Sequence, residues 1–297
     1  MGTEDVSPRY RDIDLWPPAD VVDAIVDAQL AAVAAVRAVG PAIGDAVAAA
    51  VARLGAGEGR LVYVGAGASG RLAVQDGVEL PPTYGWPHER LMYLMAGGDT
   101  ALVRSVEGAE DDTAAPGEAF ERAGVGSADV VVAVAASGRT PYAVAAVDAA
   151  RRLGALTVAL ANNAASPLLA SADHPILLQT GPEVVAGSTR MAAGTAQKVA
   201  LNAFSTALMV GLNRTWSNLM VDVAASNAKL DRRRVRLLQR IVPVDDDRAS
   251  ALLQAAGGHV KTAALLAAGD DAESAAARLH RHGGNLRRAL AECPLTI

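Results

Sequence analysis

One stretch of the sequence limits the fold more than any other, residues 59–84, which read GRLVYVGAGASGRLAVQDGVELPPTY. The apolar run 61–64 has the length and β-branched character of a strand, a glycine-rich turn follows over 65–70, and a helix is expected over 69–79. Pro81 and Pro82 end that helix, because proline lacks an N–H group and disfavours helical geometry in the preceding residue. Free N–H groups and the positive end of a helix dipole therefore predict an anion site, and Glu79 stands where the helix must end.

The same alternation of strand and helix continues along the chain. Strands are predicted at 60–64, 91–95, 129–135, 155–161 and near 175–179, and helices at 69–79, about 99–109, 116–123 and 141–153. Continuous apolar strands that alternate with helices are typical of a parallel sheet covered on both faces. The sequence therefore predicts an α/β fold, followed by a long helix from Thr189 to about Gly211.

Three regions are predicted from the pattern of elements. Residues 1–55 form an extended, proline-containing arm to residue 18 and two alanine-rich helices broken at Gly40-Pro41, and residues 56–220 form the α/β domain. Strands cease after about residue 225, and short helices are expected at 228–241, 246–256, 259–268, 271–282 and 284–291. Residues 225–297 are thus predicted to form a small helical C-terminal domain, and its five arginines within 231–240 are read as a solvated helix face.

Charge and composition exclude several classes of partner. The formal net charge is −5, which offers no basic surface for a nucleic acid or a membrane, and no apolar run is long enough to span a bilayer. The single cysteine, Cys293, excludes an intramolecular disulfide framework, and no secretion signal is recognised at the start. The five histidines form no metal-binding motif, so no metal is predicted and a cytoplasmic protein is expected.

A second loop of the same kind follows the strand 129–135. The sequence continues as ASGRTP over 136–141, and a helix is expected to begin at Pro141, a favoured first-turn position. Ser137 and Thr140 place hydroxyl groups at this second helix N-terminus. A phosphorylated metabolite held between Ser69 on one loop and Ser137 and Thr140 on the other is the interpretation that we favour.

Two other interpretations of the first loop stay open. GAGASG matches the dinucleotide pattern G-x-G-x-x-G, but the acid expected about 20 residues later is missing, since Asp99 lies 32 residues beyond Gly67. The glycines could also serve a tight turn that binds nothing. No G-x-S-x-G motif supports a hydrolase with a serine nucleophile.

Two carboxylates are the candidates for acid–base chemistry. Glu79 precedes Leu-Pro-Pro-Thr-Tyr, and Glu110 lies in the acidic run VEGAEDD at 106–112. Two such groups act as an acid and a base when their environments separate their pKa values. From the residues alone a solvated loop is the favoured interpretation of Glu110, and an exposed helix-end acid is equally open for Glu79.

Several long strings together resemble the bacterial N-acetylmuramic acid 6-phosphate etherases of the sugar isomerase (SIS) superfamily. They are GRLVYVGAGASGRL, ELPPTYG, VEGAEDD, AASGRTPY, EVVAGSTRMAAGTAQK and NLMVD, together with the arm Thr3-Glu4…Ser7-Pro8-Arg9…Asp14 and His282-Gly283-Gly284. The resemblance implies a three-layer SIS sandwich, a cytoplasmic homodimer, no metal and no cofactor. It implies conversion of N-acetylmuramic acid 6-phosphate and water to N-acetylglucosamine 6-phosphate and D-lactate.

The resemblance also implies roles for particular residues. Glu79 would be the acid on the departing lactate oxygen and Glu110 the base that removes the C2 proton. By analogy with SIS sites, the phosphate would be held by Ser69, Gly70, Ser137, Gly138 and Thr140. For Glu79 to be protonated near neutral pH, burial or the second carboxylate must raise its pKa.

Spacing places the two ends of such a site apart. Glu79 follows Ser69 by ten residues, or about 15 Å along a helix, which is longer than a hexose 6-phosphate from phosphorus to C3. We therefore expect Glu79 to serve a phosphate held by the partner subunit, with the site near the dimer interface.

The chain also departs from the family. Ala68 stands where threonine is usual, Val78 where serine is usual, Ser217 where glycine is usual, and Asp27-Ala28-Gln29 where Glu-Asp is common. The absence of a hydroxyl at Ala68 removes one hydrogen bond that a substrate could use. Another SIS enzyme, such as an aldose–ketose isomerase, and a non-catalytic sugar-phosphate sensor related to glucokinase regulatory proteins stay open as alternatives.

Overall fold

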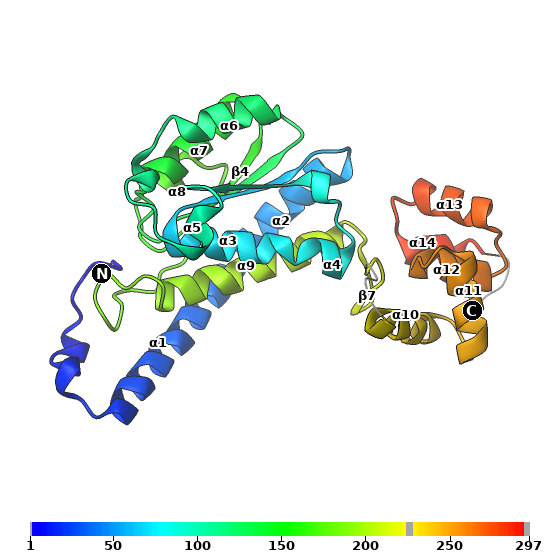
Figure 1. Ribbon diagram of the computed structural model, residues 1–297, viewed down its shortest axis with the longest axis horizontal. Helices are drawn as coiled ribbons and strands as arrows, with labels where there is room; N and C mark the ends of the chain where they lie inside the picture. Colours follow the sequence, from blue (N-terminus) through cyan, green and yellow to red (C-terminus); the bar gives the residue numbers. More distant parts are fainter. Residues whose placement is uncertain (1, 224–227, 294–297) are drawn as a thin grey trace. The chain divides into compact units, whose positions relative to one another are not determined.

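The computed structural model describes residues 2–223 and 228–293 (Figure 1). They group into two compact units: Met1–Gly77 with Glu89–Ala207, and Val78–His88 with Leu208–Ile297. Among the described residues, no helix combines the length and the apolar character that crossing a bilayer requires.

The first unit begins with short helical turns instead of the expected extended arm. Pro8–Tyr10 (η1) and Ile13–Leu15 (η2) are 3₁₀ helices, and the prolines at 17 and 18 lead directly into α1 (Pro18–Ala38). Proline fits the first turn of a helix because its missing N–H would be unpaired there. The predicted break at Gly40-Pro41 is confirmed, since α2 (Gly40–Gly55) starts a new helix at that point.

Five parallel strands form the centre of the first unit, as predicted. They are β1 (Leu61–Gly65), β2 (Leu91–Met95), β3 (Val130–Val134), β4 (Leu156–Ala161) and β5 (His174–Leu177), in the spatial order β2-β1-β3-β4-β5. The order reverses between β1 and β3, the point at which ligands bind in open parallel sheets of this kind. The sheet therefore predicts a site at the carboxyl ends of β1 and β3.

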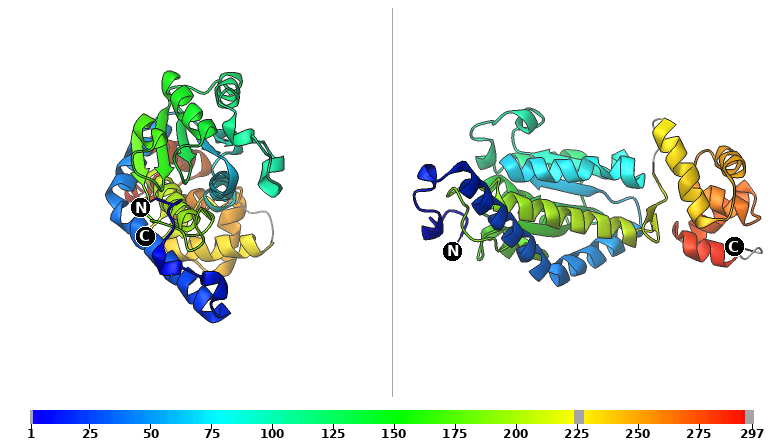
Figure 2. Two further views of the ribbon diagram at one scale, coloured as in Figure 1. Left: turned by 90° about the vertical axis from the view of Figure 1, so that its left-hand side faces the viewer. Right: turned by 90° about the horizontal axis from the view of Figure 1, so that it is seen from below.

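Helices cover both faces of the sheet (Figures 1 and 2). One face carries α6 (Ala115–Ala123), α7 (Pro141–Arg152) and α8 (Pro167–Ser171), and the other carries α2, α3 (Gly67–Val78) and α9 (Ala192–Gly211). The inner strands are fully buried, and Val62, Val64 and Val131 pack with Phe120 and Val147 in the core beneath α6 and α7. This three-layer arrangement is the predicted fold class, which the structure confirms.

The predicted helix at about 99–109 is wrong. Only α5 (Thr100–Val103) forms, Arg104 is extended, and a 3₁₀ turn, η4 (Ala109–Asp111), follows Gly108 in left-handed geometry. The intervening chain turns back over the sheet, and Val106 packs against Gly97. The contact is so close that a Cβ on Gly97 would lie 2.8 Å from the Val106 Cβ. Tertiary packing therefore overrides the local helical pattern and leaves 104–108 as a loop.

The second unit contains α4 (Leu80–Tyr84), a hairpin of β6 (Thr215–Trp216) and β7 (Leu219–Met220), and the C-terminal helices. These are α10 (Ala228–Ile241), α11 (Asp246–Ala255), α12 (Val260–Ala267), α13 (Ala272–Arg281) and α14 (Leu286–Ala291). The predicted C-terminal helices are confirmed, and Asp245, Asp271 and Asn285 accept backbone N–H bonds at three of their N-termini. A core that includes Leu238, Ala263 and Leu265 holds them together.

Candidate functional site

The turn after β1 brings backbone atoms into direct contact. A Cβ on Gly65 would lie 2.7 Å from the Cα of Gly70, and one on Gly70 would lie 2.5 Å from the Met95 sulfur, so only glycine fits at both positions. The Gly70 N–H donates to the Ala66 carbonyl at 3.0 Å and closes the turn into α3. Ser69 lies in the first turn of that helix, near the N-terminus where the sequence predicts it, and is buried.

The loop after β3 carries the remaining predicted phosphate ligands. The Ser137 hydroxyl accepts the Arg139 N–H at 3.1 Å, and Thr140 precedes α7 without capping it through its side chain. Gly138 has φ 64°, and a Cβ on it would lie 2.3 Å from the Ser166 Oγ. The first N–H groups of α7 thus have no cap from Thr140, an arrangement that suits an anion.

The sheet register places these two loops side by side. Gly65 at the end of β1 pairs with Val134 at the end of β3. Because the strands are parallel, the turn at 65–70 and the loop at 135–140 leave the same edge of the sheet. Both loops therefore flank the point at which the strand order reverses, where the sequence pattern predicts the phosphate.

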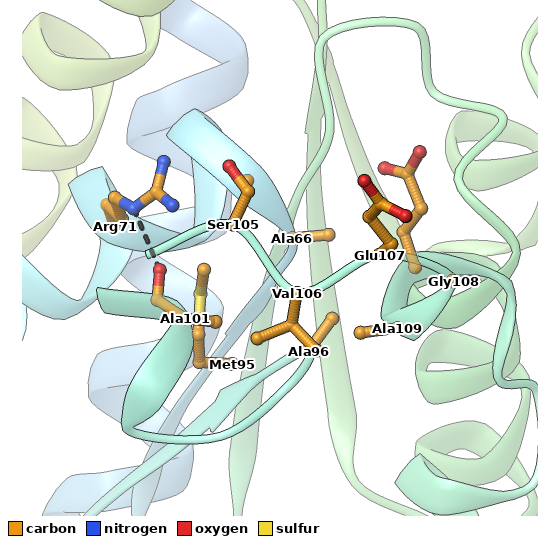
Figure 3. A pocket seen from close by; sticks show the side chains of 12 residues that line it. Ala66, Arg71, Met95, Ala96, Ala101, Ser105, Val106, Glu107, Gly108 and Ala109 are labelled. Carbon is orange, nitrogen blue, oxygen red and sulfur yellow. Dashed lines mark hydrogen bonds between the residues drawn. The ribbon is translucent and has the colours of Figure 1, made fainter. Parts of the chain in front are cut away.

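A pocket of about 360 Å³ lies beside the first loop (Figure 3). The pocket is lined by Ala66 and Gly67 of the glycine-rich turn at 65–70, the predicted anion turn, and by Glu110 of η4. The structure therefore brings the predicted base to the predicted anion turn. Its floor is apolar and includes Met95, Ala96 and Val106. Ser69, Ser137 and Thr140 are not among its lining residues.

Other polar side chains also line this pocket, and sequence reasoning missed them as site residues. Figure 3 shows Arg71 and Ser105 on one side of the pocket and Glu107 on the other, with Ala66 and Val106 between them. Arg71 and Glu107 each belong to a string that the family resemblance quotes, but neither carries a local signal that separates a pocket residue from a surface charge.

Glu79 belongs to the second unit. α3 ends at Val78, and Glu79 precedes α4, whose first turn contains the proline pair, so the predicted stop before Pro81 is confirmed. The Glu79 carbonyl accepts the Thr83 N–H at 3.2 Å, but its side chain makes no capping bond and is exposed. Burial, one of the two environments that we predicted for this carboxyl, is therefore absent from the single chain.

A buried carboxylate, Asp76, escaped the sequence analysis. It accepts hydrogen bonds from the Tyr63 hydroxyl at 2.7 Å, the Asn202 amide at 2.6 Å and the Ser205 hydroxyl at 3.1 Å. Burial and then the Asp76 charge raise the pKa of Tyr63 well above its ordinary value and that of Tyr93 to about 12, so both phenols stay neutral. The cluster joins α3, β1 and α9, and so fixes the helix that carries the anion turn.

Two further contacts brace the carboxyl edge of the sheet. The Thr3 N–H donates to the Asn163 side chain at 2.9 Å and the Asn163 amide donates to the Thr3 hydroxyl at 2.8 Å, which binds the N-terminal arm to the loop after β4. Glu183 is buried and accepts the N–H groups of Ala192 and Ala193, both at 2.9 Å, at the start of α9. A carboxylate is favoured there by the helix dipole.

In the part of the chain that the structure describes, no group of three or more acidic, histidine or cysteine side chains is arranged to hold a metal ion. The polar groups around the pocket are hydroxyls, carboxylates, a guanidinium and backbone N–H groups. Such a set suits binding of an anionic sugar and proton transfer.

Family models match two overlapping parts of the chain. Residues 44–151 match the glucokinase regulatory protein N-terminal SIS domain, and residues 115–207 match the SIS domain. Solved structures with a similar chain path include a phosphoheptose isomerase from Francisella tularensis, 19% identical over 66% of this chain and 98% of that chain, with a TM-score of 0.48.

Curated relatives extend the likeness to nearly the full chain. A protein of Deinococcus radiodurans named N-acetylmuramic acid 6-phosphate etherase is 53% identical over 98% of this chain and 95% of its own length. Relatives of the same name in Symbiobacterium thermophilum, 54% identical over 72% of each chain, and in Mesorhizobium japonicum, 43% identical over 98% of this chain and 95% of the relative, agree. The chain therefore belongs to the N-acetylmuramic acid 6-phosphate etherase family.

Proposed function

We propose that this enzyme cleaves the lactyl ether of N-acetylmuramic acid 6-phosphate as a carbon–oxygen lyase, in the pocket beside Glu110. The observation that carries the proposal is the meeting of Glu110 with the glycine turn in one cavity at the reversal of strand order. The names of the curated homologues support the etherase function over a sensor or an isomerase. A cytoplasmic location stays a prediction.

The reaction proceeds by elimination and then addition of water. Opening of the sugar to its C1 aldehyde makes the C2 hydrogen acidic, and Glu110 as a carboxylate removes it. The C3–O bond breaks as the C2=C3 double bond forms, and Glu79 as a carboxylic acid gives its proton to the departing lactate oxygen. Water then adds to the double bond, and the product is N-acetylglucosamine 6-phosphate.

The phosphate supplies binding energy away from the reacting carbons. Ser69 and Gly70 on the first loop and Ser137, Gly138 and Thr140 on the second are the proposed ligands, at two helix N-termini on one sheet edge. Holding the phosphate there orients C2 and C3 toward Glu110, which lowers the entropic part of the barrier.

Release of D-lactate from N-acetylmuramic acid 6-phosphate tests the function. Glu79→Gln and Glu110→Gln should each lower kcat by about 100-fold or more, because each removes one proton-transfer group. Asp111→Asn is the matched control, since this exposed acid shares η4 with Glu110 and does not line the pocket. In D₂O, Glu79→Gln should still exchange the C2 hydrogen and Glu110→Gln should not; the reverse pattern would exchange the two roles, and binding without lactate release would support the sensor.

We also propose a homodimer in which α1 contacts a second copy of the chain. Ala24, Ala32 and Val36 on α1 are buried within the unit, but the opposite face exposes Val22, Val26, Leu30 and Val33, which are 57%, 50%, 66% and 46% exposed. Their spacing of four, four and three residues makes one continuous apolar stripe. A self-complementary contact across a two-fold axis would bury such a stripe on both copies at once.

Mixing the two inactive variants tests whether subunits share the site. If Glu79 of one subunit serves Glu110 of the other, each mixed dimer of Glu79→Gln and Glu110→Gln has one intact site, and random mixing should restore about a quarter of wild-type activity. No restoration would place both carboxylates of a site in one chain. Leu30→Glu should shift sedimentation toward the monomer, and an unchanged dimer would remove α1 from the interface.

A further inference from the structure

Arg71 lies on α3, directly after the glycine-rich turn at 65–70, and its guanidinium is held on one side by hydrogen bonds. Its Nε donates to the Ala101 carbonyl at 2.9 Å, as Figure 3 shows, and to the Leu102 carbonyl at 3.2 Å, and both residues belong to α5. These bonds use the Nε–H group of the guanidinium. Within the described ranges, no carboxylate lies within ion-pair distance of its two terminal nitrogens. The two terminal nitrogens are therefore available to a ligand in the pocket.

Charge is distributed unevenly along the walls of this pocket. Among the described residues that line the pocket, Arg71 is basic, and Glu107 and Glu110 are acidic. Figure 3 places Arg71 beside Ser105 and across the pocket from Glu107. A negatively charged part of a ligand is thus repelled by the side with the glutamates and attracted to the side with Arg71, so the charges favour one orientation of the ligand in the pocket.

The substrate carries two anionic groups, and the loops account for one of them. The phosphate on C6 has proposed partners at the two helix N-termini, but the carboxylate of the lactyl group on C3 has none. Because Glu110 must reach the hydrogen on C2, the neighbouring C3 and its lactyl group have to lie in the same pocket. A planar guanidinium with its two terminal nitrogens free matches a carboxylate in geometry and in charge.

We propose that Arg71 binds the carboxylate of the lactyl group and so distinguishes the substrate from the product. This inference rests on the proposed etherase function. N-acetylglucosamine 6-phosphate keeps the phosphate but has only a hydroxyl group on C3, so Arg71 gains nothing from it. Arg71 also holds the lactate carboxylate while the ether oxygen leaves, which keeps that charge away from Glu107 and Glu110.

Binding of two ligands to one variant tests this assignment without any need for turnover. Calorimetry in a Glu110→Gln background gives Kd for N-acetylmuramic acid 6-phosphate and for N-acetylglucosamine 6-phosphate, with and without Arg71→Gln. Arg71→Gln should weaken binding of the substrate by about 10- to 100-fold and change binding of the product by less than about 3-fold. Arg104→Gln is the control, because Arg104 is an exposed residue at the end of α5 that does not line the pocket.

Two outcomes would overturn the proposal. Equal weakening of both ligands would assign Arg71 to the phosphate or to the packing of α5, and no change in either Kd value would remove Arg71 from recognition. If Arg71→Gln does not fold, as circular dichroism would show, Arg71→Lys decides, since a lysine cannot bond to the α5 carbonyls and the carboxylate together and should lower the ratio by several-fold. Tight binding of the substrate with no lactate release by the wild type would instead contradict the proposed function and leave the Kd ratio as a valid test of Arg71.

Discussion

Gly138→Ala is the substitution whose effect follows most directly from the structure. Gly138 has φ 64°, and an alanine in that left-handed region costs about 1–2 kcal/mol. The new Cβ would also lie 2.3 Å from the Ser166 Oγ, 2.5 Å from the Ser166 Cβ and 3.0 Å from the Ala161 Cβ. Overpacking of this kind adds about 1–3 kcal/mol, so we expect the free energy of unfolding to fall by about 2–5 kcal/mol.

Ser166→Gly separates the two contributions. It removes both serine atoms that the new methyl would meet, and the Ser166 Oγ finds no hydrogen-bond partner in the described part of the chain. Ser166 precedes α8 without capping it, so Ser166→Gly alone should cost only a few tenths of a kcal/mol, or about 0.3. In the double variant most of the overpacking of about 1–3 kcal/mol disappears, and the left-handed strain of about 1–2 kcal/mol remains together with the contact to the Ala161 Cβ at 3.0 Å.

Urea unfolding of the wild type, the two single variants and the double variant, followed by circular dichroism, measures this coupling. A coupling energy below about 0.5 kcal/mol would refute the contact between Gly138 and Ser166 as the source of the loss. The same four proteins test the proposed phosphate site, because displacement of the loop at 137–140 should raise KM in Gly138→Ala. Ser166→Gly should then restore part of the wild-type KM.

Three further substitutions probe other parts of the fold. Asp129→Asn breaks the pair with Arg60 at 2.9 Å and should cost about 2–3 kcal/mol of stability. Burial opposes ionisation of Asp129, but the hydrogen bonds from Arg60 and Gly126 outweigh burial and lower the pKa of Asp129. In thermal unfolding at several pH values, the wild type should therefore lose this stability as the pH falls below about 4, and the variant should not. Ser217→Gly should raise the stability of the second unit by about 0.5–1 kcal/mol, measured by tryptophan fluorescence in urea, because Ser217 has φ 50° in the two-residue turn between β6 and β7. Glu183→Gln removes the charge at the N-terminus of α9 and should cost about 1–2 kcal/mol in the same assay by circular dichroism, whereas no loss would mean that the dipole contributes nothing there.

The local hydrophobic pattern and the residues that begin or end helices and strands made the backbone of this fold predictable. The strands of the parallel sheet are short apolar runs between glycines and polar turns, and α11, α13 and α14 begin at aspartate or asparagine caps. The anion turn was predictable for the same reason, because Gly65 and Gly70 occur where only glycine can pack. These signals lie within a few residues of the structure that they predict.

The polar contacts that brace the site gave no such signal, because their partners are distant in the sequence. Asp76 and Asn202 are separated by 126 residues, and Thr3 and Asn163 by 160. In the sequence Asp76 is an acid inside a helix, and Thr3 is a polar residue in an arm, each of which would ordinarily face solvent. The pocket role of Arg71 was hidden likewise, since it depends on α5, which the sequence pattern extended into a longer helix than the one that forms.

The segment that follows Glu79 is anchored by residues more than a hundred positions away. Gly85 has φ 60°, and a Cβ on it would lie 2.4 Å from the Asp222 carbonyl oxygen, so the turn after α4 packs directly on the chain beyond β7. Arg214 donates to the Gly85 carbonyl at 3.3 Å and lies over the ring of the buried Trp86. The resemblance strings ELPPTYG and NLMVD, which are far apart in the sequence, thus meet in one contact.

This contact continues into the C-terminal helices. Lys261 on α12 donates to the Asp222 carboxylate at 2.6 Å and to the Asn213 carbonyl at 2.8 Å; burial lowers the pKa of the lysine, and Asp222 opposes that shift. The Asn213 side chain in turn exchanges hydrogen bonds with Asn285 and the Gly283 carbonyl at the start of α14. The string His282-Gly283-Gly284 is therefore linked to the segment after Glu79 through this series of contacts. The C-terminal helices fix the hairpin, the hairpin fixes the turn at Gly85, and the turn fixes the segment that carries the proposed acid.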